Sequence, residues 1–169
     1  MTAVSKPLIL LDVDGVLNAF RRPGPGWRSH RRSGFHLWLN PAHGPALLKL
    51  AAELDCELVW ATTWEHTANS EIAPLVGLPE LPVIEVGGPR QLPDTNVMWK
   101  TPAVADYVSG RPFLWFDDDV DLNDMAYLAS HDNVGEFQLI VTDGDDGLTD
   151  QNLTEAAAWL SQWKGAHRA

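Results

Sequence analysis

Residues 8–18 read LILLDVDGVLN, an apolar run that ends in two aspartates and a glycine. Four consecutive apolar residues, Leu8 to Leu11, predict a buried strand. Asp12 and Asp14 are two residues apart, so an extended chain would point both side chains to one side. Neighbouring carboxylates repel each other, which indicates that the pair faces a cation, a shared proton or a reacting phosphate.

Strand and helix patterns alternate along the rest of the chain. Strands are predicted at 8–13, 56–63, 81–86, 111–116 and 137–143, and helices at 40–54, 64–77, 101–110, 121–132 and 149–165. This alternation predicts an α/β fold with a central parallel sheet of about five strands and helices on both faces. In such folds ligands bind beyond the carboxyl ends of the strands.

The composition limits the classes of function. The chain has 169 residues, which suits a single domain over residues 1–169, and a net charge of −11 argues against general binding to DNA backbone or anionic membranes. Cys56 is the only cysteine, so no internal disulfide can form, and a reducing compartment is expected. We see no signal peptide and no apolar run long enough for a membrane helix, and therefore expect a cytoplasmic protein.

Acidic residues gather after two of the predicted strands. Asp12 and Asp14 follow the first, and the segment FDDDVDLND, residues 116–124, follows the fourth. Hard oxygen ligands at one sheet edge suit Mg²⁺. A calcium-binding EF-hand loop is the alternative, but from Asp117 it requires glycine at its sixth position and glutamate at its twelfth, where the chain has Leu122 and Leu128.

Groups that can hold a phosphate occur at the same predicted edge. Thr62, at the end of the second strand, offers a hydroxyl and a backbone N–H. Lys100 comes just before a predicted helix and offers an ammonium group close to a helix amino terminus. Gly15 allows the backbone to approach a bound group closely.

These residues resemble the four motifs of the haloacid dehalogenase (HAD) superfamily of phosphohydrolases. The motifs are DVDGVLN, Thr62 after LVWA, Lys100 in WKTP, and FLWFDDD. The resemblance covers about residues 7–164, and the segments WATTW, WK and GLT are similar to the small HAD domain associated with bacterial RNA-repair proteins. It implies a three-layer, Rossmann-like fold.

The resemblance also implies a role for each motif residue. Asp12 would be the nucleophile that becomes an aspartyl phosphate, and Asp14 would act as general acid and then general base, with its backbone carbonyl on Mg²⁺. Thr62 and Lys100 would hold the phosphoryl oxygens. Asp117 would bind Mg²⁺, with Asp118 as a second ligand or as the residue that orients Asp117. An acid at position 14 favours phosphate-ester hydrolysis over carbon–halogen cleavage.

Three departures from the family pattern leave alternatives open. Thr63 follows Thr62, so either threonine could bind the phosphate, and Asp121 could replace Asp118. Neither the segment between the first two predicted strands nor the segment between Thr62 and Lys100 has room for a full cap domain. An open site suits a large substrate, such as a protein or a nucleic-acid end, or a cap supplied by a partner subunit.

Residues 18–40, which we call the basic flap, are expected to form a loop or short hairpin. The flap carries five of the twelve lysine and arginine residues together with aromatic side chains. Arginine matches phosphates and aromatic rings stack on bases, so we expect the flap to contact substrate, with Arg31 and Arg32 as candidate ligands. The alternative is a solvated loop whose arginines pair with the acidic body.

The sequence therefore predicts a Mg²⁺-dependent phosphatase whose substrate is a phosphorylated molecule such as a nucleotide or a nucleic-acid end. The first alternative is a weakly catalytic or non-catalytic module that binds phosphate, nucleotide or RNA. A response-regulator receiver uses similar residues, but it needs aspartate after the third strand and lysine after the fifth, which are missing here. A third alternative is an interaction subunit whose flap binds RNA. The oligomeric state is left open.

Overall fold

The computed structural model describes residues 5–92 and 96–167. The strands are β1 (Leu8–Leu11), β2 (Asn18–Ala19), β3 (Arg28–Arg32), β4 (Phe35–Leu39), β5 (Glu57–Trp60), β6 (Phe113–Asp117) and β7 (Phe137–Val141). The helices are α1 (His43–Glu53), α2 (Thr67–Glu71), α3 (Ala73–Val76), α4 (Thr101–Val108), α5 (Leu122–Ser130) and α6 (Asp150–Ala166).

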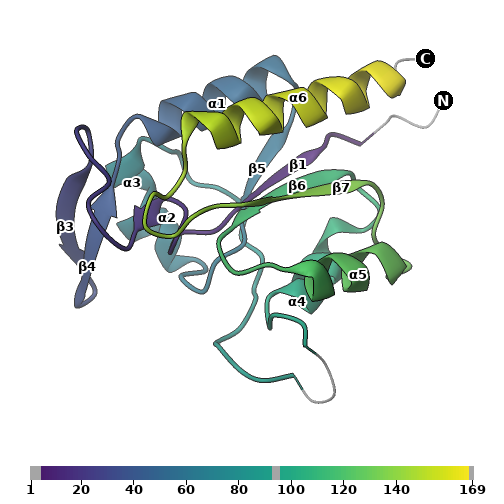
Figure 1. Ribbon diagram of the computed structural model, residues 1–169, viewed down its shortest axis with the longest axis horizontal. Helices are drawn as coiled ribbons and strands as arrows, with labels where there is room; N and C mark the ends of the chain where they lie inside the picture. The colour runs from purple at the N-terminus through teal and green to yellow at the C-terminus, as the bar shows by residue number, and fades with distance from the viewer. Residues whose placement is uncertain (1–4, 93–95, 168–169) are drawn as a thin grey trace.

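A parallel sheet forms the middle of three layers, as predicted. Its strand order is β5-β1-β6-β7, and β1 pairs with β5 on one side and β6 on the other. Helices α1 and α6 cover one face, and α4 and α5 cover the other (Figure 1). Side chains of β1 alternate between these layers: Ile9 and Leu11 pack with α1 and α6, and Leu8 and Leu10 pack with α4 and α5. All four are 0% exposed, so the first strand is the centre of the core.

The predicted third strand, 81–86, is not a strand of this sheet. It runs beside the edge strand β5 and forms one isolated bridge, between Trp60 and Val83. The Trp60 N–H donates to the carbonyl of Pro82 over 2.9 Å, and the Ile84 N–H donates to the carbonyl of Trp60 over 2.9 Å. Pro82 has no N–H to continue a ladder, which confines this segment to the sheet edge. Within the described residues, the main sheet therefore has four strands rather than about five.

The predicted helix at 64–77 is two short helices instead. Helix α2 ends at Glu71, and α3 begins at Ala73 with Pro74 in its first turn. A proline inside a continuous helix removes a hydrogen bond and clashes with the carbonyl four residues earlier, so the helix breaks before Pro74. The predicted end at Gly77 is confirmed, because Gly77 closes α3 with φ of +82°.

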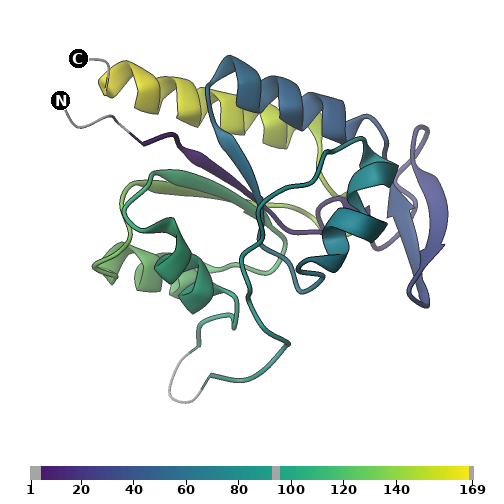
Figure 2. The ribbon, with the colours of Figure 1, turned by 180° about the vertical axis from the view of Figure 1, so that it is seen from behind.

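The basic flap contains a hairpin, which is one of the two forms expected for it. Strands β3 and β4 pair antiparallel and are joined by Ser33 and Gly34, which have φ of +48° and +83°. Two positive φ values are typical of the tight turns that suit hairpins. Strand β2 pairs with β4 to complete a small sheet in the order β2-β4-β3. Figure 2 shows the hairpin projecting at the end of the molecule opposite the start of β1.

No full cap domain is present in the part of the chain that the structure describes. The segment between β1 and α1 holds only the small sheet, and residues 77–92 and 96–100, between α3 and α4, form irregular chain. Within residues 5–92 and 96–167, none of the helices combines the length and the apolar content needed to cross a bilayer.

Candidate active site

The motif residues meet at the carboxyl edge of the parallel sheet. Asp12 follows β1, Thr62 follows β5, Asp117 is the last residue of β6, and Lys100 immediately precedes α4. Their exposed fractions are 5% for Asp12, 4% for Lys100 and 0% for both Thr62 and Asp117. Charged groups are almost never this deeply buried unless they are paired, which makes the arrangement a candidate active site.

Lys100 bridges the two buried aspartates. Its Nζ lies 2.8 Å from Oδ2 of Asp12 and 2.5 Å from Oδ2 of Asp117. The other carboxylate oxygens accept backbone hydrogen bonds, from Val13 N to Asp12 over 2.7 Å and from Asp119 N to Asp117 over 2.9 Å. Each carboxylate is thus held in one orientation by a charged group and a backbone donor.

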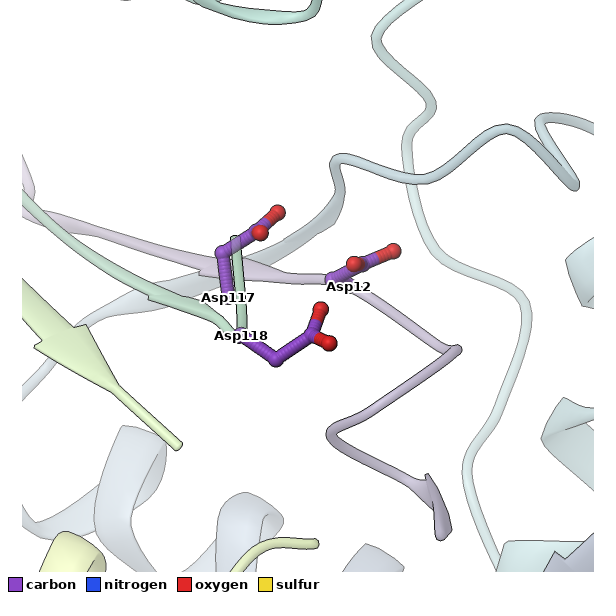
Figure 3. A group of neighbouring side chains, drawn as sticks. All are labelled: Asp12, Asp117 and Asp118. Atoms are coloured by element: carbon purple, nitrogen blue, oxygen red, sulfur yellow. The ribbon is translucent and has the colours of Figure 1, made fainter. Parts of the chain in front are cut away.

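Asp118 completes a group of three carboxylates. One oxygen from each of Asp12, Asp117 and Asp118 lies within 4.8 Å of the others (Figure 3). Lys100 supplies one positive charge, so the ionised group keeps an excess of negative charge in a buried place. Hard carboxylate oxygens with excess negative charge are the donor set that Mg²⁺ prefers, and the residues present therefore fit a magnesium ion.

The electrostatics of the group show the same need for a cation. Burial raises the pKa of Asp12 well above its ordinary value, and the charge of Asp117 raises it further, although Lys100 opposes both effects. Burial and Asp117 also raise the pKa of Asp118 to about 6. Burial alone would lower the pKa of Lys100, but Asp12 and Asp117 outweigh it and raise this pKa above its ordinary value. Lys100 is therefore a permanent cation here.

Gly15 allows Asp118 to approach the loop after β1. Gly15 has φ of +79°, and a Cβ at this position would lie 2.2 Å from Cγ of Asp118. The loop is held by Thr142, whose hydroxyl donates to the Gly15 carbonyl over 2.7 Å. The structure thus gives Gly15 a specific neighbour, the Asp118 carboxylate.

The carboxylate of Asp14 lies apart from the three-carboxylate group and is held by two donors. Asn18 Nδ2 donates to it over 2.8 Å, and the indole Nε1 of Trp64 donates over 3.0 Å. Asn18 is itself fixed, because its Oδ1 accepts from the Trp38 N–H over 2.8 Å. Sequence reasoning did not single out Asn18, although its place four residues after Asp14 in a tight loop was a usable signal.

The two threonines differ in accessibility. Thr62 is fully buried, and its hydroxyl oxygen accepts from the Trp64 N–H over 3.2 Å. Thr63 is exposed and lines a pocket of about 350 Å³ that also contains Asp12, Asp14, Lys100 and Asp118. The Thr63 hydroxyl is therefore the more accessible of the two to a ligand in this pocket.

Asp121 and Asp124 form a capping box at the start of α5. The carboxylate of Asp121 accepts hydrogen bonds from N–H groups of the first helical turn. It is therefore engaged at the helix start and is not part of the three-carboxylate group. Asp124 is 1% exposed, and its Oδ1 accepts from Met98 N over 2.9 Å and from Thr101 Oγ1 over 2.6 Å. Because these partners flank Lys100, Asp124 positions the lysine. The helix predicted from residue 121 placed Asp124 in its first turn, but the sequence did not indicate its contacts around Lys100.

The structure does not bring the flap arginines into contact with the three carboxylates. Arg31 and Arg32 lie on β3, where Arg31 is exposed. Arg32 Nε lies 3.6 Å from Glu71 Oε2, and Arg21 forms an ion pair with Asp145. Part of the flap therefore pairs with the acidic body, while Arg31 has no ion pair among the described residues.

A comparison with protein families extends these observations. The family model described as the HAD domain in Swiss Army Knife RNA repair proteins matches residues 8–153. This range includes every residue of the candidate active site. No curated protein and no solved structure matches the chain.

Proposed function

Because this chain belongs to the family of HAD domains in Swiss Army Knife RNA repair proteins, we propose that it is a Mg²⁺-dependent phosphatase that acts through an aspartyl phosphate on Asp12. The observation that carries this proposal is the buried Asp12–Lys100–Asp117 arrangement, with Asp118 as a third carboxylate beside it. A permanent cation next to an oriented carboxylate is the arrangement that a phosphoryl-transfer site requires.

The proposed magnesium ligands are Asp12, Asp117, Asp118 and the backbone carbonyl of Asp14. Asp118 is preferred to Asp121, whose carboxylate caps α5. When bound, the ion would offset the repulsion between the carboxylates and an approaching phosphate, and would orient that phosphate.

In the first step, a carboxylate oxygen of Asp12 attacks phosphorus while the bond from phosphorus to the leaving oxygen breaks. Lys100 favours the ionised form of Asp12, as the bound cation would, and neutralises charge on the phosphoryl oxygens, and a threonine hydroxyl at 62 or 63 donates to them. Asp14 enters this step as the neutral acid and gives its proton to the leaving oxygen. The leaving group departs as an alcohol.

In the second step, Asp14 is ionised and accepts a proton from water as the water oxygen attacks phosphorus. The bond between phosphorus and Asp12 then breaks, which releases inorganic phosphate and restores both aspartates. The hydrogen bonds from Asn18 and Trp64 keep Asp14 in one position through both steps.

We propose that the substrate is a phosphorylated nucleotide or nucleic-acid end. The absence of a full cap within the described residues leaves the site open, and the basic flap carries the exposed arginines Arg28 and Arg31. A cytoplasmic location remains a prediction from the single cysteine and the composition.

Phosphate release with Mg²⁺ and with EDTA tests the proposal. The substrates are p-nitrophenyl phosphate, nucleotides, a phosphopeptide, and oligonucleotides phosphorylated at either end. Asp12→Asn should reduce release by more than about a thousand-fold. Asp132→Asn makes the same chemical change at an exposed aspartate outside the site and should leave release unchanged. A wild-type protein that binds Mg²⁺ in calorimetry but releases no phosphate from any substrate would overturn the proposal in favour of a binding module.

A further inference from the structure

A second pocket lies next to the catalytic one. It has a volume of about 430 Å³ and is lined by Asp14, Ser33, Phe35, Thr63, Trp64 and Thr67. Asp14 and Thr63 also line the pocket that contains Asp12 and Lys100. The two pockets therefore meet at Asp14, with the nucleophile on one side and the tip of the flap hairpin on the other.

Aromatic side chains form a wall of this second pocket. Phe35 is 61% exposed, and its ring meets Trp64 edge to face, with centroids 5.6 Å apart and an interplanar angle of 61°. Phe20, which is 57% exposed, lines the catalytic pocket. Exposed phenylalanine rings beside a polar site leave apolar faces in water, which a ligand with a ring of its own would cover.

The position of Asp14 indicates which part of a substrate enters this pocket. In the proposed function Asp14 protonates the leaving oxygen, so the leaving group must reach past Asp14 on the side away from Asp12. That side is the second pocket. Trp64 connects the two features, because its indole Nε1 donates to Asp14 over 3.0 Å while its ring contacts Phe35.

The remaining lining favours a nucleoside over a simple aryl group. Ser33 and Thr67 place hydroxyl groups at the same pocket, and these can bond to a base edge or to a sugar hydroxyl. Arg28 is exposed on β3, on the hairpin face that also carries Phe35, and has no ion pair in the described part of the chain. Arg31 is on the opposite face of the hairpin. A tyrosine ring would leave the two hydroxyl groups unused.

We infer that the second pocket is a leaving-group subsite for the nucleoside that carries the phosphate, and that the exposed ring of Phe35 stacks on its base while Trp64 supports Phe35 edge to face. This inference rests on the proposed function. The nucleoside could belong to a free nucleotide or to the end of a nucleic-acid strand, which share this chemistry.

The test compares kcat/KM for adenosine monophosphate with kcat/KM for ribose phosphate, which lacks the base. Phe35→Ala should lower the value for adenosine monophosphate by at least about five-fold and leave that for ribose phosphate unchanged, because only the base stacks. Phe35→Leu keeps an apolar side chain without the ring and should show most of the same loss. Met125→Ala removes another exposed apolar side chain, on α5, and should change neither value. Equal effects of Phe35→Ala on both substrates would overturn the subsite.

Binding provides a readout that does not depend on turnover. In an Asp12→Asn background, calorimetry should show weaker binding of adenosine monophosphate after Phe35→Ala, by the same factor. If this holds while the wild type hydrolyses nothing, the subsite stands and the proposed phosphatase fails. If the wild type hydrolyses both substrates but Phe35→Ala changes neither binding nor kcat/KM, the phosphatase stands and the subsite fails.

Two further measurements distinguish the molecules that could supply the ring, namely a nucleic-acid strand, a free nucleotide or a phosphotyrosine peptide. A phosphorylated oligonucleotide that loses affinity on Arg28→Ala, while adenosine monophosphate does not, would support a strand end. Equal affinities of the oligonucleotide before and after that substitution would support a free nucleotide. A phosphotyrosine peptide with a higher kcat/KM than both would overturn the nucleoside assignment.

Discussion

Replacing Lys100 by methionine should destabilise the fold strongly and make its stability depend on Mg²⁺. Methionine keeps the length of the side chain but removes the charge that bridges Asp12 and Asp117 over 2.8 Å and 2.5 Å. All three groups are at most 5% exposed, so water cannot replace the lost partner. Removing one partner from a buried ion pair costs about 3–5 kcal/mol, and we expect a loss in this range in the free energy of unfolding.

Urea unfolding in EDTA measures this loss. Lys49→Met is the matched control, because Lys49 faces Glu53 at 3.9 Å on the exposed side of α1 and should change stability by at most about 1 kcal/mol. Adding Mg²⁺ should restore stability to Lys100→Met more than to the wild type, since the ion would replace the missing cation between the carboxylates. Acidification should also reduce the difference, because it neutralises Asp12.

A loss no larger than that of Lys49→Met would refute this reasoning, since it would mean that the two carboxylates do not need Lys100. A large loss that Mg²⁺ does not reduce would leave the ion pair but contradict the proposed metal site.

Three other predictions concern neighbouring groups. Asp118→Ala should abolish Mg²⁺ binding in calorimetry with little loss of stability, whereas Asp121→Ala should cost about 1 kcal/mol in urea unfolding and keep Mg²⁺ binding, because Asp121 caps α5. Burial lowers the pKa of His43 to about 4 from its ordinary 6.5, so on acidification His43 binds a proton at a higher pH in the unfolded chain than in the folded protein. The free energy of unfolding therefore has its full value above about pH 6.5 and falls by about 3 kcal/mol as the pH drops toward 4. His43→Phe should remove this pH-dependent loss from a series of urea unfolding curves. Trp64→Phe removes one of the two donors to Asp14 and should lower kcat about ten-fold in steady-state kinetics, on nucleotides and on p-nitrophenyl phosphate alike, because Asp14 is also the base of the second step that both substrates share.

The sequence was sufficient to predict the layers and the edge of the sheet that carries the site. The apolar run before Asp12 and the repeated alternation of strand and helix patterns have local causes that can be read along the chain. Parallel pairing then brings Asp12 and Asp117 to one edge, because both end strands that point the same way. The resemblance in the four motifs supplied the roles that we propose for these residues.

Contacts between distant segments could not be predicted in the same way. The bond from Trp64 to Asp14 and the contacts of Asp124 around Lys100 depend on how loops fold back, which no local pattern encodes. The edge segment at 81–86 has the apolar residues of a strand, but Pro82 limits its pairing to one bridge. The choice of Asp118 over Asp121 as the proposed metal ligand likewise depended on where α5 begins, because the Asp121 carboxylate caps that helix.

Detection of a phosphoryl group on Asp12 tests the central claim most directly. Asp14→Asn should still accept phosphate from p-nitrophenyl phosphate, since this leaving group departs without a proton, but should release it slowly because the general base is missing. Acid quenching followed by peptide mass spectrometry should then find one phosphoryl group, on Asp12, only when Mg²⁺ is present. Phosphate release without any modified Asp12, or a phosphoryl group on another residue, would contradict the assignment of Asp12 as the nucleophile.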